Sequence, residues 1–422
     1  MAVPLDKSAR GSPLGVGATL DRAIGAWPRG SDPIAQARRV LDGERLLDWQ
    51  RGRGGAIVHL IHQWGGGVET HAAELAQSQV AIGVGALVLR IVGPSTVRLM
   101  APREYPNILF DLAGPEDAAA FRHVIAADGR ATLHVHHVIG LDLAALDTLM
   151  ACFARRVLTL HDYYFVCPQI TLRDHAGKPC NVRPSKVCDH CVAVLKPAAR
   201  HLKPVAAHRA AMTKIAAGAE RVFTPSASAR DLLVRGLGSI PITVAPHADR
   251  GPLAAARPAS GGTRTIVTIG PFSADKGAII LADVIRDAGE RSLPLRFALA
   301  GPATWENPPK NVTVLGPYDR GTIADILARV GGHIAFLPSI VAETYMFTLS
   351  ECVRAGYFPV VFDIGAQAER VRQLGWGSVL PLGTSPRRIG DYLAGIDIPP
   401  LDSGRVEEWL SKDRIGPLDY YT

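Results

Sequence analysis

Two carboxylates frame a stretch of the sequence that holds no other charge. Glu343 and Glu351 stand eight residues apart in AETYMFTLSE, shortly after the apolar run HIAFLPS. We expect a strand to end at Leu337 and a helix to begin between Tyr345 and Thr348, so that Glu343 precedes the helix and Glu351 lies inside it. A carboxylate near the carboxyl end of a parallel strand can accept two vicinal hydroxyl groups, as from a ribose. Two exposed glutamates are the alternative, which the spacing alone does not exclude.

A lysine stands at the start of a predicted helix in the same half of the chain. In IGPFSADKGAIILADVI, a strand is expected to end at Gly270, and Lys276 and Gly277 open the next helical pattern. An ammonium group and the unpaired amides of a helix N-terminus would then converge, which suits a diphosphate. A solvated surface lysine is the alternative.

A glycine-rich loop follows the first strand-like run. AIVHLIHQW is followed by Gly65, Gly66 and Gly67 and then by a helical pattern that begins VETH. Such a loop allows a ligand to approach the backbone closely, with the helix N-terminus facing an anion. A tight turn without a ligand explains the glycines equally well. The pattern is not GxGxxG, which disfavours a nicotinamide enzyme.

Histidines cluster at the ends of two neighbouring strand-like runs. HVHHVIG contains His134, His136 and His137, and LTLHDYYF contains His161 and Asp162. Open α/β sheets place ligands at these strand ends, so His161 and Asp162 are candidates for a crevice site. Strand alternation puts His134 and His136 on one face and His137 on the other. Each residue taken singly is also explained as a packed or solvent-facing side chain.

Four cysteines lie in one excursion of the chain. They are Cys167, Cys180, Cys188 and Cys191. Four thiolates can bind a structural zinc ion and close a loop that has little apolar material. Free thiols are the second interpretation, and a redox or disulfide role is the third. A catalytic zinc is disfavoured, because four thiolates leave no open position.

Composition limits the class of protein. The 422 residues carry a net charge of +7, with 47% hydrophobic and 20% charged residues and a mean hydropathy of +0.13. This is typical of a globular enzyme with two domains. The basic residues are scattered, which favours phosphates or an anionic membrane surface over nucleic acid as partners. The first residues contain no apolar leader, and no apolar run is long enough to span a membrane, so we expect a cytoplasmic protein that can associate with the inner face of the cell membrane.

Short apolar strands alternate with helical patterns twice along the chain, which predicts an α/β fold of two Rossmann-like domains across a crevice. We expect an N-terminal extension at 1–54, a first domain at 55–249 with a cysteine-rich loop at 165–192, a linker at 250–263, a second domain at 264–400, and a helical tail at 401–422 that packs back on the first domain.

Most of the chain resembles a known family. LPSIVAETYMFTLSECVRAGYFPVVFDIGAQAERV is similar to the donor-binding segment of retaining family 4 (group 1) glycosyltransferases of the GT-B fold, which carry Glu-x7-Glu. The segments GGGVETH, HVHHV, FTPSASARDLL, ITVAPHAD and RFALAG follow in the family order, over about residues 56 to 400. TLHDYYFVCPQITL resembles the branch found among bacterial O-antigen and surface-polysaccharide transferases.

The resemblance implies a retaining transfer of a sugar from a nucleoside diphosphate sugar to a saccharide or lipid-linked acceptor, with no metal needed for catalysis. It implies catalytic roles for His136, Lys276 and Glu343, with Lys276 on the diphosphate, Glu343 on the donor sugar and His136 near the reacting sugar. It assigns Glu351 to the ribose. The other implied donor contacts are Gly66, Gly67, Tyr318, Tyr345, Met346, Phe347 and Thr348.

Two positions depart from the family pattern. The usual Gly-Arg before the lysine loop is here Gly270-Pro271, so a second cation for the diphosphate is missing, and another arginine or a histidine would have to replace it. The usual Glu-x-Phe-Gly ends here in Tyr345-Met346, which makes the loop less permissive. A sugar-nucleotide epimerase and a zinc-stabilised scaffold that has lost transfer are the alternative functions.

Overall fold

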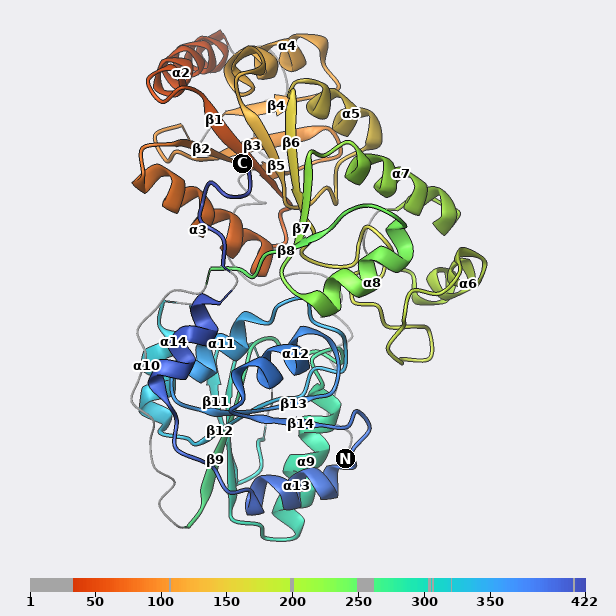
Figure 1. Cartoon of the computed structure of the whole chain (residues 1–422), viewed down its shortest axis with the longest axis vertical. Coiled ribbons are helices and arrows are strands. Elements are labelled where there is room, and N and C mark those ends of the chain that lie inside the picture. Colours follow the sequence, from red (N-terminus) through yellow and green to blue (C-terminus); the bar gives the residue numbers. More distant parts are fainter. Residues whose placement is uncertain are drawn as a thin grey trace.

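The computed structural model describes two α/β domains, one above the other in Figure 1. It describes residues 33–105, 108–197, 201–248, 262–302, 305, 307–319, 321–412 and 414–422. Residues 1–32 of the predicted extension and 250–261 of the predicted linker therefore lie outside the described residues.

The first domain is built on an eight-stranded sheet with the order β4-β3-β2-β1-β5-β6-β7-β8. Its strands are β1 (Ala56–Ile61), β2 (Gly85–Ile91), β3 (Thr96–Ala101), β4 (Leu109–Asp111), β5 (Thr132–Val135), β6 (Arg155–Thr159), β7 (Arg221–Thr224) and β8 (Thr243–Val244). Its helices are α2 (Pro33–Arg51), α3 (Gly67–Ala81), α4 (Pro115–Val124), α5 (Leu143–Ala151), α6 (Ser185–Leu195), α7 (Val205–Ala217) and α8 (Ala227–Leu237), with a short 3₁₀ turn η2 (Ala127–Gly129).

The strands expected in this half are present, but the expected β-α-β pattern does not hold throughout. β2, β3 and β4 pair antiparallel, whereas the other neighbours are parallel. Only residues 92–95 connect β2 to β3, and such a connection is too short for the crossover that a parallel strand needs.

The second domain is built on a six-stranded parallel sheet with the order β11-β10-β9-β12-β13-β14. Its strands are β9 (Arg264–Ile269), β10 (Leu295–Ala300), β11 (Val312–Gly316), β12 (Ile334–Leu337), β13 (Phe358–Phe362) and β14 (Ser378–Leu380). Its helices are α9 (Ala278–Glu290), α10 (Ile323–Val330), α11 (Phe347–Arg354), α12 (Gly365–Leu374), α13 (Pro386–Gly395) and α14 (Ser403–Ser411).

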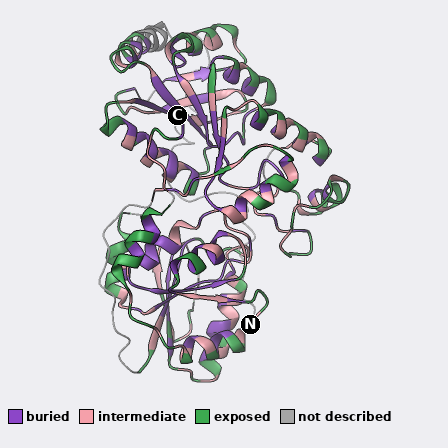
Figure 2. Ribbon diagram, viewed as in Figure 1, coloured by how far each residue is buried: buried purple, intermediate pink, exposed green. Residues whose placement is uncertain are grey.

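Burial explains why these sequences form inner strands. Every residue of β1, β12 and β13 is buried, because helices cover both faces of each sheet, and their sequences are accordingly apolar apart from His59 in β1. Figure 2 shows the buried strands at the centre of each domain and exposed residues on the outer sides of the helices.

The two ends of the described chain pack differently. In the described part of the predicted extension, Leu46 and Leu47 of α2 are fully buried, so this helix belongs to the first domain. The prediction that the whole tail packs on the first domain is corrected. Val406 and Trp409 of α14 join the core of the second domain, and only the residues after it reach the first domain, where Tyr420 contacts Phe223. The apolar face of α14 fixes the helix where it lies.

No helix among the described residues has both the length and the apolar character needed to cross a membrane.

Candidate functional site

The chain order reverses at one place in each sheet. In the second domain, β9 and β12 are neighbours although β10 and β11 intervene in the sequence, and in the first domain the same holds for β1 and β5. Ligands of open α/β sheets bind beyond the carboxyl ends of strands at such a point. We call the loops that follow β1, β5, β6, β9 and β12 the interdomain site, because they meet between the two domains.

Lys276 and Glu343 come together in this site. Lys276 follows β9 and Glu343 follows β12, and the Lys276 Nζ lies 2.5 Å from Oε1 of Glu343. The Ser339 hydroxyl donates to the same oxygen at 2.7 Å. The sequence placed both residues at strand ends, and the reversal of strand order makes them neighbours.

Close backbone approach holds this pair in place. Gly277 has φ +80°, and a Cβ there would lie 2.0 Å from the carbonyl oxygen of Pro338. The backbone of Glu343 is fixed from both sides, since its amide donates to Oε1 of Gln367 at 3.1 Å and its carbonyl accepts from the amide of Ala366 at 2.8 Å. The loop after β12 is therefore rigid around Glu343.

The segment between the two glutamates makes the contact with the first domain. The Thr344 hydroxyl donates to the carbonyl of His161, and the Tyr345 hydroxyl donates to the carbonyl of His247 at 2.9 Å. The Phe347 ring stacks on His247, and a Cβ at Gly67 would lie 3.3 Å from that ring. The structure thus brings Gly67, Tyr345 and Phe347 together as interdomain packing residues.

Met346 has a strained backbone. It is the residue before α11 and adopts φ +68°, ψ +80°. This left-handed conformation is unfavourable in free energy for any residue that has a Cβ atom. This is the position at which the resembled family has glycine.

The remaining predicted donor residues surround α11. The helix begins at Phe347, as expected, and Glu351 is buried within it at 6% exposure. A Cβ at Gly270 would touch the Thr348 methyl group, so Thr348 faces the loop after β9. Gly66 precedes α3 with φ +76°, and Tyr318 is half-buried beyond the end of β11.

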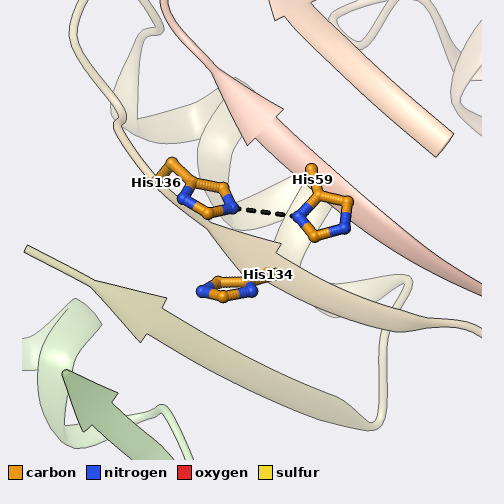
Figure 3. A group of neighbouring side chains, drawn as sticks. All are labelled: His59, His134 and His136. Carbon is orange, nitrogen blue, oxygen red and sulfur yellow. Dashed lines mark hydrogen bonds between the residues drawn. The ribbon is translucent and has the colours of Figure 1, made fainter. Parts of the chain in front are cut away.

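A continuous chain of hydrogen bonds joins three histidines of the first domain, His59, His136 and His161. Both ring nitrogens of His136 have histidine partners: its Nε2 lies 2.9 Å from Nδ1 of His59, and its Nδ1 lies 2.9 Å from Nε2 of His161 (Figure 3 shows the bond to His59). Burial lowers the pKa of His59 to about 4 and places the pKa values of His136 and His161 well below their ordinary value. These imidazoles are therefore neutral near pH 7.

Gln79 fixes the direction of this chain. Its amide nitrogen lies 3.1 Å from the carbonyl of Pro417, which can only accept, so Oε1 of Gln79 must accept from Nε2 of His59 at 2.8 Å. His59 Nδ1 then accepts from His136, and Nδ1 of His136 accepts from His161. His161, at 9% exposure, is the end of the chain nearest the interdomain site.

Asp162 and His137 form a separate pair. The amide of Ile139 donates to Nδ1 of His137, so its Nε2 carries the proton that is donated to Asp162 at 3.0 Å. Burial would raise the pKa of Asp162, but its interaction with His137, including the hydrogen bond, and the hydrogen bond from the amide of Tyr164 outweigh this effect and hold the pKa below its ordinary value.

The four cysteines of the loop are free thiols in this structure. Arg209 donates to the sulfur of Cys188 at 3.3 Å, and burial raises the pKa of Cys167 to about 12. Among the described residues, the groups whose candidate ligand atoms lie within 4.8 Å of one another contain histidines only, so the four sulfurs form no such group. Structural zinc at these cysteines stays a prediction.

Two cavities were found away from the Lys276–Glu343 pair. One of about 660 Å³ lies at the amino end of β10, between Leu295 and Asn311, on the side of the sheet opposite the site. The other, of about 260 Å³, lies between the domains, and Tyr345 is the only predicted donor residue in its lining.

Sequence reasoning missed several residues of the site. They are His59, His71, Gln79, Arg173, His247, Arg370 and Tyr421. His71 directly follows the glycine loop and His247 ends a strand-like run, so strand-end position was the available signal. Gln79 and Tyr421 carry no local signal, because they meet the histidines only through the fold.

Comparison with known proteins supports the architecture. No protein-family model matches this chain, and no curated protein does. Among solved structures, a sucrose-phosphate synthase from Thermosynechococcus elongatus matches with a TM-score of 0.51 and 13% identity, over 87% of this chain and 95% of that one. A glycosyltransferase from Rickettsia africae matches with a TM-score of 0.52 and 14% identity, over 87% and 94%. At such identities the likeness concerns the fold, and the chain has the two-domain GT-B fold of these proteins.

Proposed function

We propose that this chain is a retaining glycosyltransferase that moves a sugar from a nucleoside diphosphate sugar to a saccharide or lipid-linked saccharide. The observation that carries the proposal is the pairing of Lys276 with Glu343 where the strand order of the second domain reverses. A solved structure with the same fold is named a glycosyltransferase, which is consistent with it. Bacterial surface-polysaccharide synthesis at the inner face of the cell membrane is the setting that the sequence resemblance implies.

The two oxygens of Glu343 have different surroundings. Lys276 and Ser339 both reach Oε1. Among the described residues no hydrogen bond to Oε2 occurs, so this oxygen is the one to accept hydroxyl groups of the donor sugar. The proposal assigns the diphosphate to Lys276 and to the backbone amides at the start of α11, and the ribose to Glu351.

Glycosyl transfer needs negative charge stabilised on the departing diphosphate while positive charge develops on the sugar. An ammonium group and helix amides supply this stabilisation without a divalent metal. In the proposed reaction the acceptor attacks from the side that the diphosphate leaves, and a phosphate oxygen takes the acceptor proton. The paired-carboxylate mechanism of glycosidases does not apply, and neither glutamate is a nucleophile.

Arg173 is the candidate for the second cation that Pro271 cannot supply. It lies in the cysteine-rich loop of the first domain, and its Nε is 2.8 Å from Oδ1 of Asp275, the residue before Lys276. These two atoms make a charge contact without hydrogen-bond geometry. Arg173 therefore lies beside the loop that carries Lys276.

The test incubates the full chain with UDP-, GDP- and dTDP-sugars, without added Mg²⁺ or Mn²⁺, together with saccharide acceptors. Release of the nucleoside diphosphate and a product with the donor's anomeric configuration by NMR are the expected results. An inverted product overturns retention. If none of the donors binds or reacts, the chain is a scaffold and the proposal is wrong.

Arg173→Ala should lower kcat at least about 10-fold, while Arg173→Lys should retain part of the activity.

A further inference from the structure

Two groups of three histidines share His136 in the first domain. The first group consists of His59, His134 and His136, and the second of His71, His136 and His161. In each group, every residue has one ring nitrogen that lies within 4.8 Å of a ring nitrogen of the other two residues. All five residues are buried. Figure 3 shows the first group, with His134 beside His136 and the bond from His136 to His59. The two groups differ in their hydrogen bonding.

The first group has a partner for every ring nitrogen. His59 is bonded to Gln79 and His136. Nδ1 of His134 is hydrogen-bonded to the Tyr421 hydroxyl at 2.7 Å, and its Nε2 to the Thr159 hydroxyl at 2.8 Å. The fold satisfies these side chains without any ligand.

The second group leaves a buried nitrogen without a hydrogen-bond partner. Nε2 of His71 is buried and has no hydrogen-bond partner among the described residues. His71 lies in α3, and the centroid of its ring is 5.2 Å from that of the His161 ring and 5.5 Å from that of the His136 ring. A buried polar group without a hydrogen-bond partner lowers the stability of the fold, and a ligand bound to this nitrogen would remove that penalty.

The protonation state of the three rings suits a metal ion. Burial lowers the pKa of His71 to about 3 and those of His136 and His161 well below the ordinary value. Each ring therefore offers a neutral lone pair near pH 7, which a metal requires. Three imidazoles with one further position open are a ligand set that suits Zn²⁺, Ni²⁺, Cu²⁺ or Fe²⁺ and not Mg²⁺ or Ca²⁺.

We propose that His71, His136 and His161 bind one divalent transition-metal ion in the first domain, at the floor of the interdomain site. The ligand atoms are Nε2 of His71, Nδ1 of His136 and Nε2 of His161. A water molecule or a ligand hydroxyl completes the coordination.

Binding needs only a local rearrangement of protons. His136 keeps the proton on its Nε2, which is donated to His59. The proton that Nε2 of His161 donates to His136 moves to Nδ1 of His161. Of these residues, His161 lies nearest the interdomain site. No proton is released overall. Nitrogens that share a tetrahedral ion with bonds of about 2.05 Å lie about 3.3 Å apart, so His136 and His161 separate by a few tenths of an ångström from their present 2.9 Å.

This ion is separate from stabilisation of the leaving group, which the proposed function gives to Lys276 in the other domain. The metal site does not depend on that function, because its ligands and its orphaned nitrogen lie within the first domain. A failure of one proposal leaves the other standing.

The test uses Co²⁺ as a spectroscopic substitute for Zn²⁺ on the chelator-treated full chain. Bound Co²⁺ gives visible ligand-field absorption, and thiolate ligation adds strong near-ultraviolet bands, so binding at the cysteines is distinguished from binding at histidines. We expect visible absorption that saturates at one ion per chain without thiolate bands from this site. Zn²⁺ should compete for it and raise the melting temperature of the chain.

His71→Gln and His161→Gln each remove one proposed ligand and should weaken Co²⁺ binding at least about 100-fold. His134→Gln is the matched control, since it belongs only to the first group, and should change affinity by less than about 10-fold. Circular dichroism verifies that each variant is folded. Binding of Co²⁺ by the unmodified chain tests the proposal even if a variant does not fold. The proposal is overturned if the unmodified chain binds no ion through histidines, if His71→Gln binds equally well, or if His134→Gln abolishes binding while His71→Gln retains it.

Discussion

Glu343 is the residue whose charge matters most to the proposed reaction, because one of its oxygens is held by Lys276 and Ser339 and the other is left for the donor. Glu343→Gln keeps the shape of the side chain but removes the charge that orients Lys276. We expect kcat/KM to fall about 10²- to 10³-fold, while the affinity for the free nucleotide changes by less than about 10-fold. Steady-state kinetics and nucleotide titration measure the two effects. Glu290→Gln, an exposed change on α9, is the control and should be silent. Full activity in Glu343→Gln would contradict its assigned role.

Met346 allows the cost of its left-handed backbone to be measured. Met346→Gly and Met346→Ala both remove the side chain, but only alanine keeps a Cβ at φ +68°. The glycine variant should therefore be more stable than the alanine variant by about 1 kcal/mol, in spite of the larger chain entropy of glycine. Urea unfolding of the two variants measures the difference. Equal stability, or a more stable alanine variant, would show that this position carries no strain.

At the scale of the elements, the sequence predicted where the strands end but not which strands lie next to each other in the sheet. Apolar runs predicted β1, β5, β6, β9 and β12, and the residues after them predicted Lys276, Glu343 and His161. β3 and β4 were not predicted, because their short, half-exposed sequences lack a continuous apolar run. Both nitrogens of His136 are bonded to histidines of β1 and of the β6 loop, and this pairing follows from strand order, which periodicity does not reveal.

Helix α7 carries a histidine that makes stability depend on pH. Nε2 of His208 donates to the carbonyl of Tyr164 at 2.7 Å. Burial lowers its pKa, although the carbonyl partly opposes this. As pH falls below about 6.5, the unfolded chain binds a proton that the folded chain does not, so the free energy of unfolding falls by up to about 1.4 kcal/mol per pH unit from this residue.

His208→Gln should remove that contribution. Urea unfolding of the original chain and the variant, between pH about 7.5 and about 5.5, should give a shallower pH dependence for the variant. The difference between the two curves isolates His208 from the other histidines. Parallel curves would show that His208 titrates equally in both states.

At the scale of the whole molecule, the two domains are joined by contacts at both sides of the site. The Glu369 carboxylate of α12 accepts from the amides of Ala227 and Ser228 at the start of α8, at 3.1 and 2.7 Å. Thr344 and Tyr345 reach the first domain on the other side. In the proposed reaction, closure of the two domains encloses the donor at the Lys276–Glu343 pair.

The end of the chain should stabilise the first domain strongly. Tyr420 and Tyr421 are buried against it, and the Tyr421 hydroxyl reaches both Gln79 and His134. A chain ended after Gly416 should lose about 3–5 kcal/mol of unfolding free energy, as after deletion of a large buried side chain. Leu418→Ser, a change at an exposed position, is the control. An unchanged urea midpoint after truncation would show that the tail contributes nothing to stability.

Calorimetric titration with UDP, GDP and dTDP tests the central claim, that the second domain binds a nucleoside diphosphate at α11. We predict that at least one of the three binds at one site per chain, and that Glu351→Gln weakens this binding about 10- to 100-fold through loss of a charged hydrogen bond to the ribose. Glu408→Gln, an exposed carboxylate on α14, should leave the affinity unchanged. Absence of binding by all three nucleotides, or equal affinity in Glu351→Gln, would contradict the account.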